Sequence, residues 1–173
     1  MEGNRKSYHA ERNFILQQGL SALPDESCPL QFSSLMFQPR MVGTVVLAAV
    51  LLQSPAIFLA LSGVLLWSAL FPRWNPFDAL YNRTIGARPA ALRLSAALAP
   101  RRFAQGLAGF VALTIGGLLL FGWNLAAYIQ EALFLSALAA LVFGRFCLGS
   151  FIFHIGSGQE EFARKTLPWQ RGH

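Results

Sequence analysis

The chemically active side chains of this sequence lie in or beside long apolar stretches. Glu131 is the one acidic residue inside such a stretch, and Gln130 directly precedes it. An ionisable group is costly in an apolar span, so Glu131 is a candidate functional residue. It either forms a hydrogen bond to another helix or to a partner, or it relays a proton or an ion. A single carboxyl group without a second acid or a histidine nearby favours the hydrogen bond.

Two cysteines and a histidine form a second group of candidates. Cys28 precedes the first apolar stretch, and Cys147 and His154 lie near the end of the last one. Redox chemistry needs a thiolate with a second thiol close by, but Ser150 stands three positions after Cys147, so there is no Cys-x-x-Cys pair. Cys147 and Cys28 are therefore candidate thiols or simply buried small residues. His154 has two alternative roles: it is either a ligand for haem or a pigment, or a polar anchor at a helix end.

None of the common catalytic or nucleotide-binding motifs occurs in the sequence. It has no Walker loop, no Rossmann glycine pattern, no nucleophile elbow, no His-Glu-x-x-His motif and no cluster of acids. Two cysteines are also too few for a four-cysteine zinc site. We predict that the chain is not an enzyme and that it binds no cofactor or metal.

The composition is typical of a membrane protein. Of 173 residues, 54% are hydrophobic and only 13% are charged, whereas soluble domains carry about 25% charged residues. Two apolar blocks, 41–71 and 103–155, are each too long for one span of roughly 20 residues. Each block is interrupted near its middle, at Gln53-Ser54-Pro55 and at Gly122-Trp123-Asn124. We predict an all-α integral membrane protein with four transmembrane helices in two hairpins, over 40–53, 56–71, 103–121 and 125–150.

The positions of the basic residues predict the orientation. The 14 Lys and Arg residues exceed the 8 Asp and Glu residues, which gives a net charge of +6. All the Lys and Arg residues lie in the two tails, in the loop 72–102, or at helix ends that face these segments. The positive-inside rule then places both tails and this loop in the cytoplasm. We expect a cytoplasmic N-terminal segment 1–38, a membrane domain 39–155 that includes the basic loop 72–102, and a cytoplasmic tail 156–173.

The basic loop is expected to contain a short helix on the membrane surface. Asn75, Pro76 and Asp78 have the order of an N-cap, a first-turn proline and a first-turn acid. Several arginines are expected to contact phosphate groups of anionic lipid. These are Arg73, Arg83, Arg88, Arg101 and Arg102. The alternative is a solvated loop that merely obeys the orientation rule.

Small residues recur at every fourth position along three of the predicted spans. Such ridges allow close approach of helices in lipid. They are Ala132, Ser136, Ala140 and Gly144 on the last span, Ala108, Ala112 and Gly116 on the third, and Ala56 and Ala60 on the second. The ridges either pack the four helices against one another or contact a neighbouring subunit.

Three blocks of the sequence together resemble a family of small bacterial integral-membrane proteins that is described only as a domain of unknown function. The blocks are NPFDALYN (75–82), APRRFAQG (99–106) and FCLG (146–149). The resemblance covers roughly residues 38–155 and implies a four-helix domain in the bacterial inner membrane. It also implies a link to thioredoxin-like or sulfur-transfer proteins, since some members have a second cysteine at the end of the last block. Ser150 occupies that position here.

We therefore expect a non-catalytic accessory or assembly subunit of a larger membrane complex, respiratory or photosynthetic. Its expected partners are other integral-membrane subunits and anionic lipids of the inner leaflet, and no nucleic acid. One alternative is a membrane partner in thiol or sulfur redox handling that uses Cys147. Another is a small transporter that uses Glu131.

Overall fold

The computed structural model of the chain describes residues 2–22, 24, 27–87 and 92–170. All regular structure in these residues is helical, which confirms the predicted all-α class. The elements are α1 (Glu2–Gln17), α2 (Cys28–Leu35), α3 (Phe37–Leu51), α4 (Pro55–Leu70), the 3-10 turn η1 (Pro72–Trp74), α5 (Pro76–Thr84), α6 (Ala99–Leu120), α7 (Asn124–Val142), α8 (Leu148–Gly156) and α9 (Glu160–Lys165).

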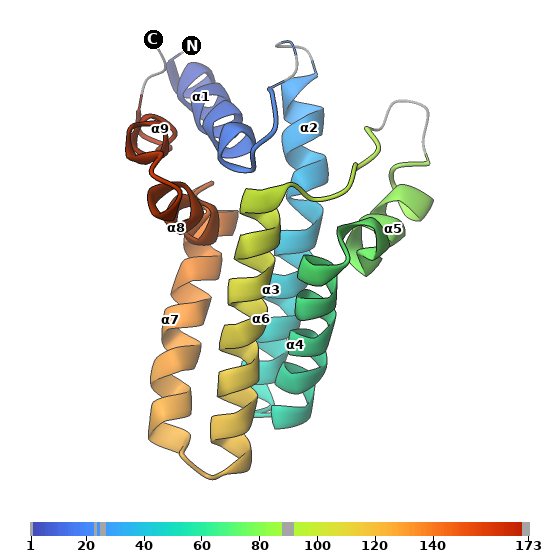
Figure 1. Ribbon diagram of the computed structural model, residues 1–173, viewed down its shortest axis with the longest axis vertical. Helices are drawn as coiled ribbons and strands as arrows, with labels where there is room; N and C mark the ends of the chain where they lie inside the picture. Colours follow the sequence, from blue (N-terminus) through green and yellow to red (C-terminus); the bar gives the residue numbers. More distant parts are fainter. Residues whose placement is uncertain (1, 23, 25–26, 88–91, 171–173) are drawn as a thin grey trace.

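Helices α3, α4, α6 and α7 form the body of the molecule (Figure 1). Both α4 and α7 pack against α3 and against α6, and the interface between α4 and α6 is the most extensive. Two tight turns lie at one end of this body, which we call the turn end, whereas both termini and α5, α8 and α9 lie at the other, the tail end (Figure 1). The apolar core between the helices includes Val46, Ala49, Phe58, Leu65 and Ile115.

Three helical segments of the described chain are long and apolar enough to cross a membrane. They are Cys28–Leu51, which joins α2 and α3, together with α6 and α7. α4 is equally apolar but has only 16 residues, fewer than the roughly 20 that a bilayer core requires of an untilted helix. These lengths and compositions indicate a membrane protein.

The interruptions predicted inside the two apolar blocks are confirmed as tight turns. Between α3 and α4, Gln53 has a φ of +46°, and Ser54 Oγ accepts a hydrogen bond from the backbone N–H of Ile57 at 3.5 Å, as an N-cap does. After α6, Gly122 has a φ of +73°, a conformation that glycine adopts without a steric penalty. Both hairpins of the body therefore have their turns where the sequence places them.

The predicted last span, 125–150, is wrong at its C-terminal end. α7 stops at Val142, and a separate helix, α8, begins at Leu148. The backbone N–H of Phe146 donates to Ala140 O at 3.1 Å, and Arg145 between them has a φ of +54°. A left-handed residue thus ends the helix, the conformation that glycine usually adopts at this position. An arginine rather than a glycine occupies the left-handed position, and for that reason the sequence pattern did not reveal the end of the helix.

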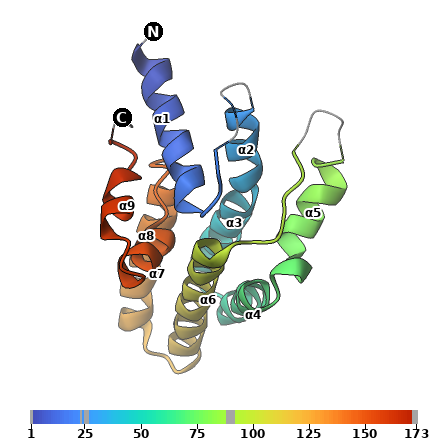
Figure 2. The same cartoon turned by 45° about the horizontal axis from the view of Figure 1, so that its top comes forward.

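Both tails dock on the tail end of the body and on each other. α1 packs on α2, and α8 packs on α6 and α9. Gln17 Nε2 donates to Thr166 O at 2.9 Å, and Asn13 Nδ2 donates to Leu167 O at 2.9 Å. Figure 2 shows α1 beside α8 and α9. The described parts of the segments 1–38 and 156–173 thus contact each other at the tail end.

Candidate functional site

Arg101, in the first turn of α6, is the centre of a buried polar network at the tail end. Its Nη2 donates to Asp78 Oδ1 of α5 at 2.5 Å and to Gln38 Oε1 of α3 at 2.8 Å. Gln105 Nε2, one turn further along α6, also donates to Gln38 Oε1 at 2.8 Å. All four side chains are buried. The contact expected between Arg101 and lipid phosphate is therefore replaced by an internal ion pair that joins three helices.

The first turn of α5 leaves two buried polar atoms without a partner. Asn75 caps the helix as predicted, because its Oδ1 accepts from Phe77 N–H at 3.0 Å. Among the described residues, however, neither Asn75 Nδ2 nor Asp78 Oδ2 has a hydrogen-bond partner. Burial raises the pKa of the Asp78 carboxyl group above its usual value, and the Arg101 guanidinium offsets part of this rise. Asp78 thus has unsatisfied hydrogen-bonding capacity beside its ion pair.

The structure brings both cysteines into one apolar cluster, where both are buried. Cys147 is 5% exposed and Cys28 is 0% exposed. Ser150 Oγ donates to Cys147 Sγ at 3.2 Å, and the backbone N–H of Cys147 donates to Gln17 Oε1 at 3.2 Å. Ser150, three positions after Cys147, is therefore a direct hydrogen-bond partner of the thiol.

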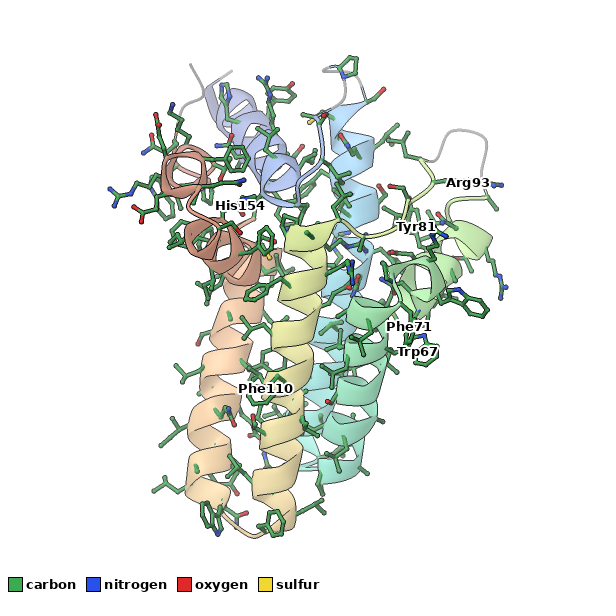
Figure 3. The ribbon with its side chains drawn as sticks, viewed as in Figure 1. Trp67, Phe71, Tyr81, Arg93, Phe110 and His154 are labelled. Carbon is green, nitrogen blue, oxygen red and sulfur yellow. The ribbon has the colours of Figure 1, made fainter. Side chains whose placement is uncertain are left out.

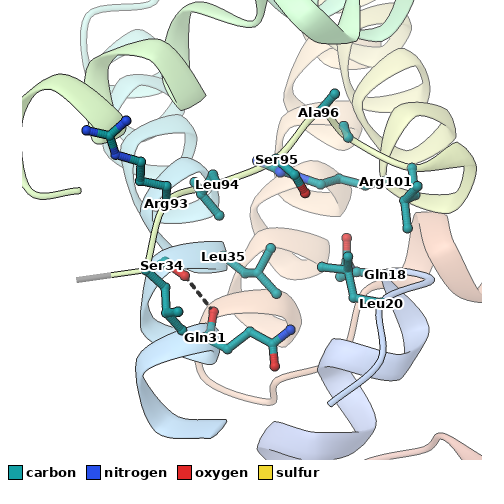
Figure 4. A pocket seen from close by; sticks show the side chains of 13 residues that line it. Gln18, Leu20, Gln31, Ser34, Leu35, Arg93, Leu94, Ser95, Ala96 and Arg101 are labelled. Atoms are coloured by element: carbon teal, nitrogen blue, oxygen red, sulfur yellow. Dashed lines mark hydrogen bonds between the residues drawn. The ribbon is translucent and has the colours of Figure 1, made fainter. Parts of the chain in front are cut away.

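Two small cavities flank Arg101. One, of 80 Å³, has Arg101, Cys147 and three glutamines in an otherwise mainly apolar wall. The other, of 100 Å³, lies between Gln18, Arg101 and the segment 92–98 (Figure 4). Each has room for several water molecules, since one needs only about 10–15 Å³ of such volume. The three glutamines are Gln18, Gln38 and Gln105. Isolated amides form no recognisable sequence pattern, so these three residues were not expected as site residues.

Glu131 forms a hydrogen bond between helices near the turn end. Gln53 Nε2, in the turn after α3, donates to Glu131 Oε2 at 3.1 Å, and Glu131 is only 3% exposed. Among the described residues, Glu131 Oε1 and Gln130 Oε1 have no partner. Of the two roles open for Glu131, the geometry favours the interhelical hydrogen bond.

His154 joins the two tails. Its Nε2 lies 3.1 Å from Gln17 O and must donate to it, and its Nδ1 lies 2.8 Å from Gln159 Oε1. Figure 3 shows His154 beside the end of α1. Both ring nitrogens are thus engaged by protein, which favours the polar anchor over a haem ligand. Within the described residues, no group of three or more His, Cys, Asp or Glu side chains could hold a metal ion.

The small-residue ridge on α6 packs the bundle. Ala112 and Gly116 are buried, and Ala108 is half-buried against the core. A Cβ atom added to Gly116 would lie 2.9 Å from the Leu59 side chain and 3.2 Å from Pro55 O of α4. This glycine therefore allows the close approach of α4 and α6.

The ridge on α7 faces outward. Ala132 and Ser136 are exposed, and Ala140 is half-buried. Gly144 lies beyond the end of α7, where a Cβ atom would lie 2.6 Å from Ala140 O. Ala56 and Ala60 of α4 are exposed as well. Gly144 is thus part of a helix end and does not extend the ridge.

The other arginines expected to contact lipid are placed as follows. Arg73, Arg83 and Arg102 are exposed at the tail end. Arg102 Nε donates to Ala69 O at 2.9 Å. Arg88 lies outside the described residues. The exposed arginines remain available to lipid phosphate, unlike Arg101.

The comparison with known protein families gives one match. A family model described as "Domain of unknown function (DUF4395)" matches residues 34–157. This range is more than half of the chain and contains Gln38, Asp78, Arg101, Glu131 and Cys147. No curated protein and no solved structure matches the chain.

Proposed function

The chain belongs to the DUF4395 family, and from the faces its helices present we propose that it is a non-catalytic accessory or assembly subunit of a larger complex in the bacterial inner membrane. In this proposal α3, α4, α6 and α7 all span the bilayer, and the basic tail end faces the cytoplasm. The partners are other integral-membrane subunits, of a respiratory or photosynthetic complex, and anionic lipids.

The observation that carries this proposal is a row of small exposed residues on α7. We define the α7 stripe as Ala132, Ser136 and Ala139, all exposed and spaced to lie on one face. The Ser136 hydroxyl donates to Ala132 O at 2.7 Å, so the stripe presents no unsatisfied donor to lipid. Small residues favour helix association in membranes because they allow backbones to approach closely.

Bulky replacements in the α7 stripe test the proposal. We expect Ala132→Leu and Ser136→Leu to insert and fold normally, because both side chains point away from the core. Each variant should retain about tenfold less co-purifying partner than the wild type, equivalent to about 1.4 kcal/mol. The measurement is quantitative mass spectrometry of the tagged protein purified in mild detergent.

The matched control is Ala48→Leu on α3. Ala48 is also small and exposed, but the residues three and four positions after it, Leu51 and Leu52, are large and exposed, so no row of small residues continues there. This variant should retain the partner. Equal partner recovery from all three variants and the wild type would count against the α7 stripe as the interface.

A second candidate function is thiol or sulfur redox handling at Cys147. The observation that favours it is that Cys147 lies in the wall of the 80 Å³ cavity, which Arg101 also lines, and accepts a hydrogen bond from Ser150. In this role Cys147 should react with a small maleimide at neutral pH, and Cys147→Ser should abolish function. Cys28, which is fully buried, should not react.

The single-cysteine variants separate the two thiols. Cys28→Ser should label at Cys147, whereas Cys147→Ser should stay unlabelled until the protein is denatured. An inert Cys147 would remove the thiol proposal. A transporter that uses Glu131 would instead require a substrate flux that is lost in Glu131→Gln, and the hydrogen bond from Gln53 favours a packing role.

A further inference from the structure

Helix α8 has its polar side chains on the inside and its apolar side chains on the outside. Ser150 and His154 are buried, and each is hydrogen-bonded within the protein. Leu148, Ile152 and Ile155 are exposed instead, and their spacing of four and three residues places them on one face of the helix. We call these three residues the α8 outer face. A surface helix that borders water has the opposite arrangement, with polar residues outside, so the α8 outer face requires an apolar neighbour.

Contacts with α6 fix the direction in which α8 runs. Gly149, near the start of α8, packs against Ala104, because a Cβ atom added to this glycine would lie 2.7 Å from Ala104 Cβ. Phe153, about one turn later, packs against Phe103, with the ring centroids 5.8 Å apart. Residues one turn apart on α8 thus meet adjacent residues of α6. Helix α8 therefore crosses α6 rather than running along it, and Figure 1 shows α8 turned away from the axis of α7.

The crossing lies at the level where α6 becomes free of charge. Arg101 and Arg102 are followed, from Phe103 to Leu120, by a stretch without any Asp, Glu, Lys or Arg. This stretch measures about 27 Å at 1.5 Å per residue, which is close to the roughly 30 Å of a bilayer core. Phe103 therefore marks one boundary of that core. Because α8 contacts α6 at Phe103 and Ala104, α8 lies at the same boundary.

Exposed aromatic rings lie at the tail end on both sides of the body. Beside α8, Phe143 is 84% exposed, and Trp169 is 70% exposed with its ring centroid 6.4 Å from that of Phe146. Trp67 and Trp74, at and just after the tail end of α4, are also exposed, and Figure 3 shows Trp67 on the opposite side of the body from α8. Tryptophan is enriched where a protein crosses the membrane interface. These rings therefore support the same headgroup level as the charge-free stretch of α6.

We propose that α8 is an in-plane membrane helix whose outer face inserts among the lipid acyl chains, just below the headgroups. The chain has no Asp, Glu, Lys or Arg between Arg145 and Glu160, so α8 enters this layer without burying such a charge. Its polar side faces the protein, where its hydrogen bonds are satisfied. The occupant of the α8 outer face is the bilayer itself rather than a protein subunit. The proposal rests on α6 as a membrane span and not on the α7 stripe, so the two proposals can fail separately.

Spin labels on the full chain test the depth of α8. Leu148→Cys, Ile152→Cys and Ile155→Cys are each made in Cys147→Ser, or in Cys147→Ala if that background does not insert, and Cys28 is too deeply buried to label. The protein is reconstituted in vesicles of phosphatidylethanolamine and phosphatidylglycerol, and power-saturation EPR with oxygen and a nickel chelate measures each depth. We expect all three labels at equal depth, about 5–10 Å inside the headgroup boundary. A helix that continued α7 across the bilayer would separate the first and last labels by about 10 Å in depth.

The matched control is Glu161→Cys on α9, an exposed position beyond the charge-free segment. The nickel chelate should reach this label several-fold more readily than the label at Ile152, whereas oxygen should favour Ile152. If the three α8 labels respond like Glu161→Cys, the α8 outer face lies in water and the lipid contact is overturned. Labels that neither reagent reaches also overturn it, because protein, such as a second copy of the chain, then covers the face. A depth difference of about 10 Å along α8 overturns the in-plane orientation.

Discussion

Replacing Arg101 with methionine is expected to cost about 3–5 kcal/mol of stability, because the change leaves the Asp78 carboxylate buried without its cation. Methionine retains much of the volume of the arginine stem, so the effect reports the lost charge and hydrogen bonds more than lost packing. Gln38 also loses one of its two donors. Unfolding in detergent, followed by circular dichroism against temperature or denaturant, measures the change.

The matched control for Arg101→Met is Arg102→Met. Arg102 is the neighbouring arginine, but it is exposed and donates only to a backbone carbonyl, Ala69 O. Its loss should cost about 1 kcal/mol or less. A double variant in which Asp78 also becomes leucine should recover much of the lost stability, because no unpaired charge remains. Equal effects of Arg101→Met and Arg102→Met would contradict the central role of the ion pair.

The deficit of Arg101→Met should also depend on pH. Burial raises the pKa of Asp78 in the folded protein, and removing the arginine raises it further. A carboxyl group whose pKa is higher in the folded than in the unfolded protein lowers stability as the pH rises above the unfolded value. The deficit should therefore be small at low pH and grow until the pH passes the raised folded pKa of the variant. A deficit that is constant between acidic and neutral pH would argue for lost packing.

Replacing Gly116 with leucine is expected to disrupt the interface between α4 and α6. Even a Cβ atom there would lie 2.9 Å from Leu59 and 3.2 Å from Pro55 O, and the second of these is backbone and cannot rotate away. Overpacking of this kind typically costs about 1–3 kcal/mol, and sometimes more. Thermal unfolding of the purified protein measures the loss.

Gly117 provides the matched control one residue away. A Cβ atom on Gly117 would meet nothing within 4 Å, so Gly117→Leu should leave stability unchanged or slightly improved, because leucine has a higher helix propensity than glycine. If the two variants unfold at the same temperature, the close approach of α4 and α6 at Gly116 is not what holds them together.

The sequence was sufficient to predict the four helices of the body and α5, but not α1, α2, α8 or α9. A proline at the start of α4 and a glycine after α6 are local features, and both mark the turns correctly. The end of α7 has no such local feature, since an arginine occupies the left-handed position and the apolar pattern continues past it. Glycine usually marks the left-handed position at a helix end, and without it the sequence does not reveal where α7 stops.

The polar network could not be predicted, because its members are distant in the sequence. Arg101 meets Asp78 across 23 residues and Gln38 across 63 residues. From composition alone, Arg101 is one of six arginines in a basic loop and looks like its neighbours. The sequence also did not reveal which ridges face the core. Small residues with the same spacing face inward on α6 and outward on α7.

The central claim is that the outward face of α7 binds another membrane subunit. The most direct measurement is native mass spectrometry of the tagged wild-type protein, purified in mild detergent from its own host. We predict a complex of fixed stoichiometry that contains the chain and at least one other integral-membrane protein. Chemical cross-linking of this complex should join the partner to α7. A free 19.0 kDa species carrying only lipid would contradict the claim.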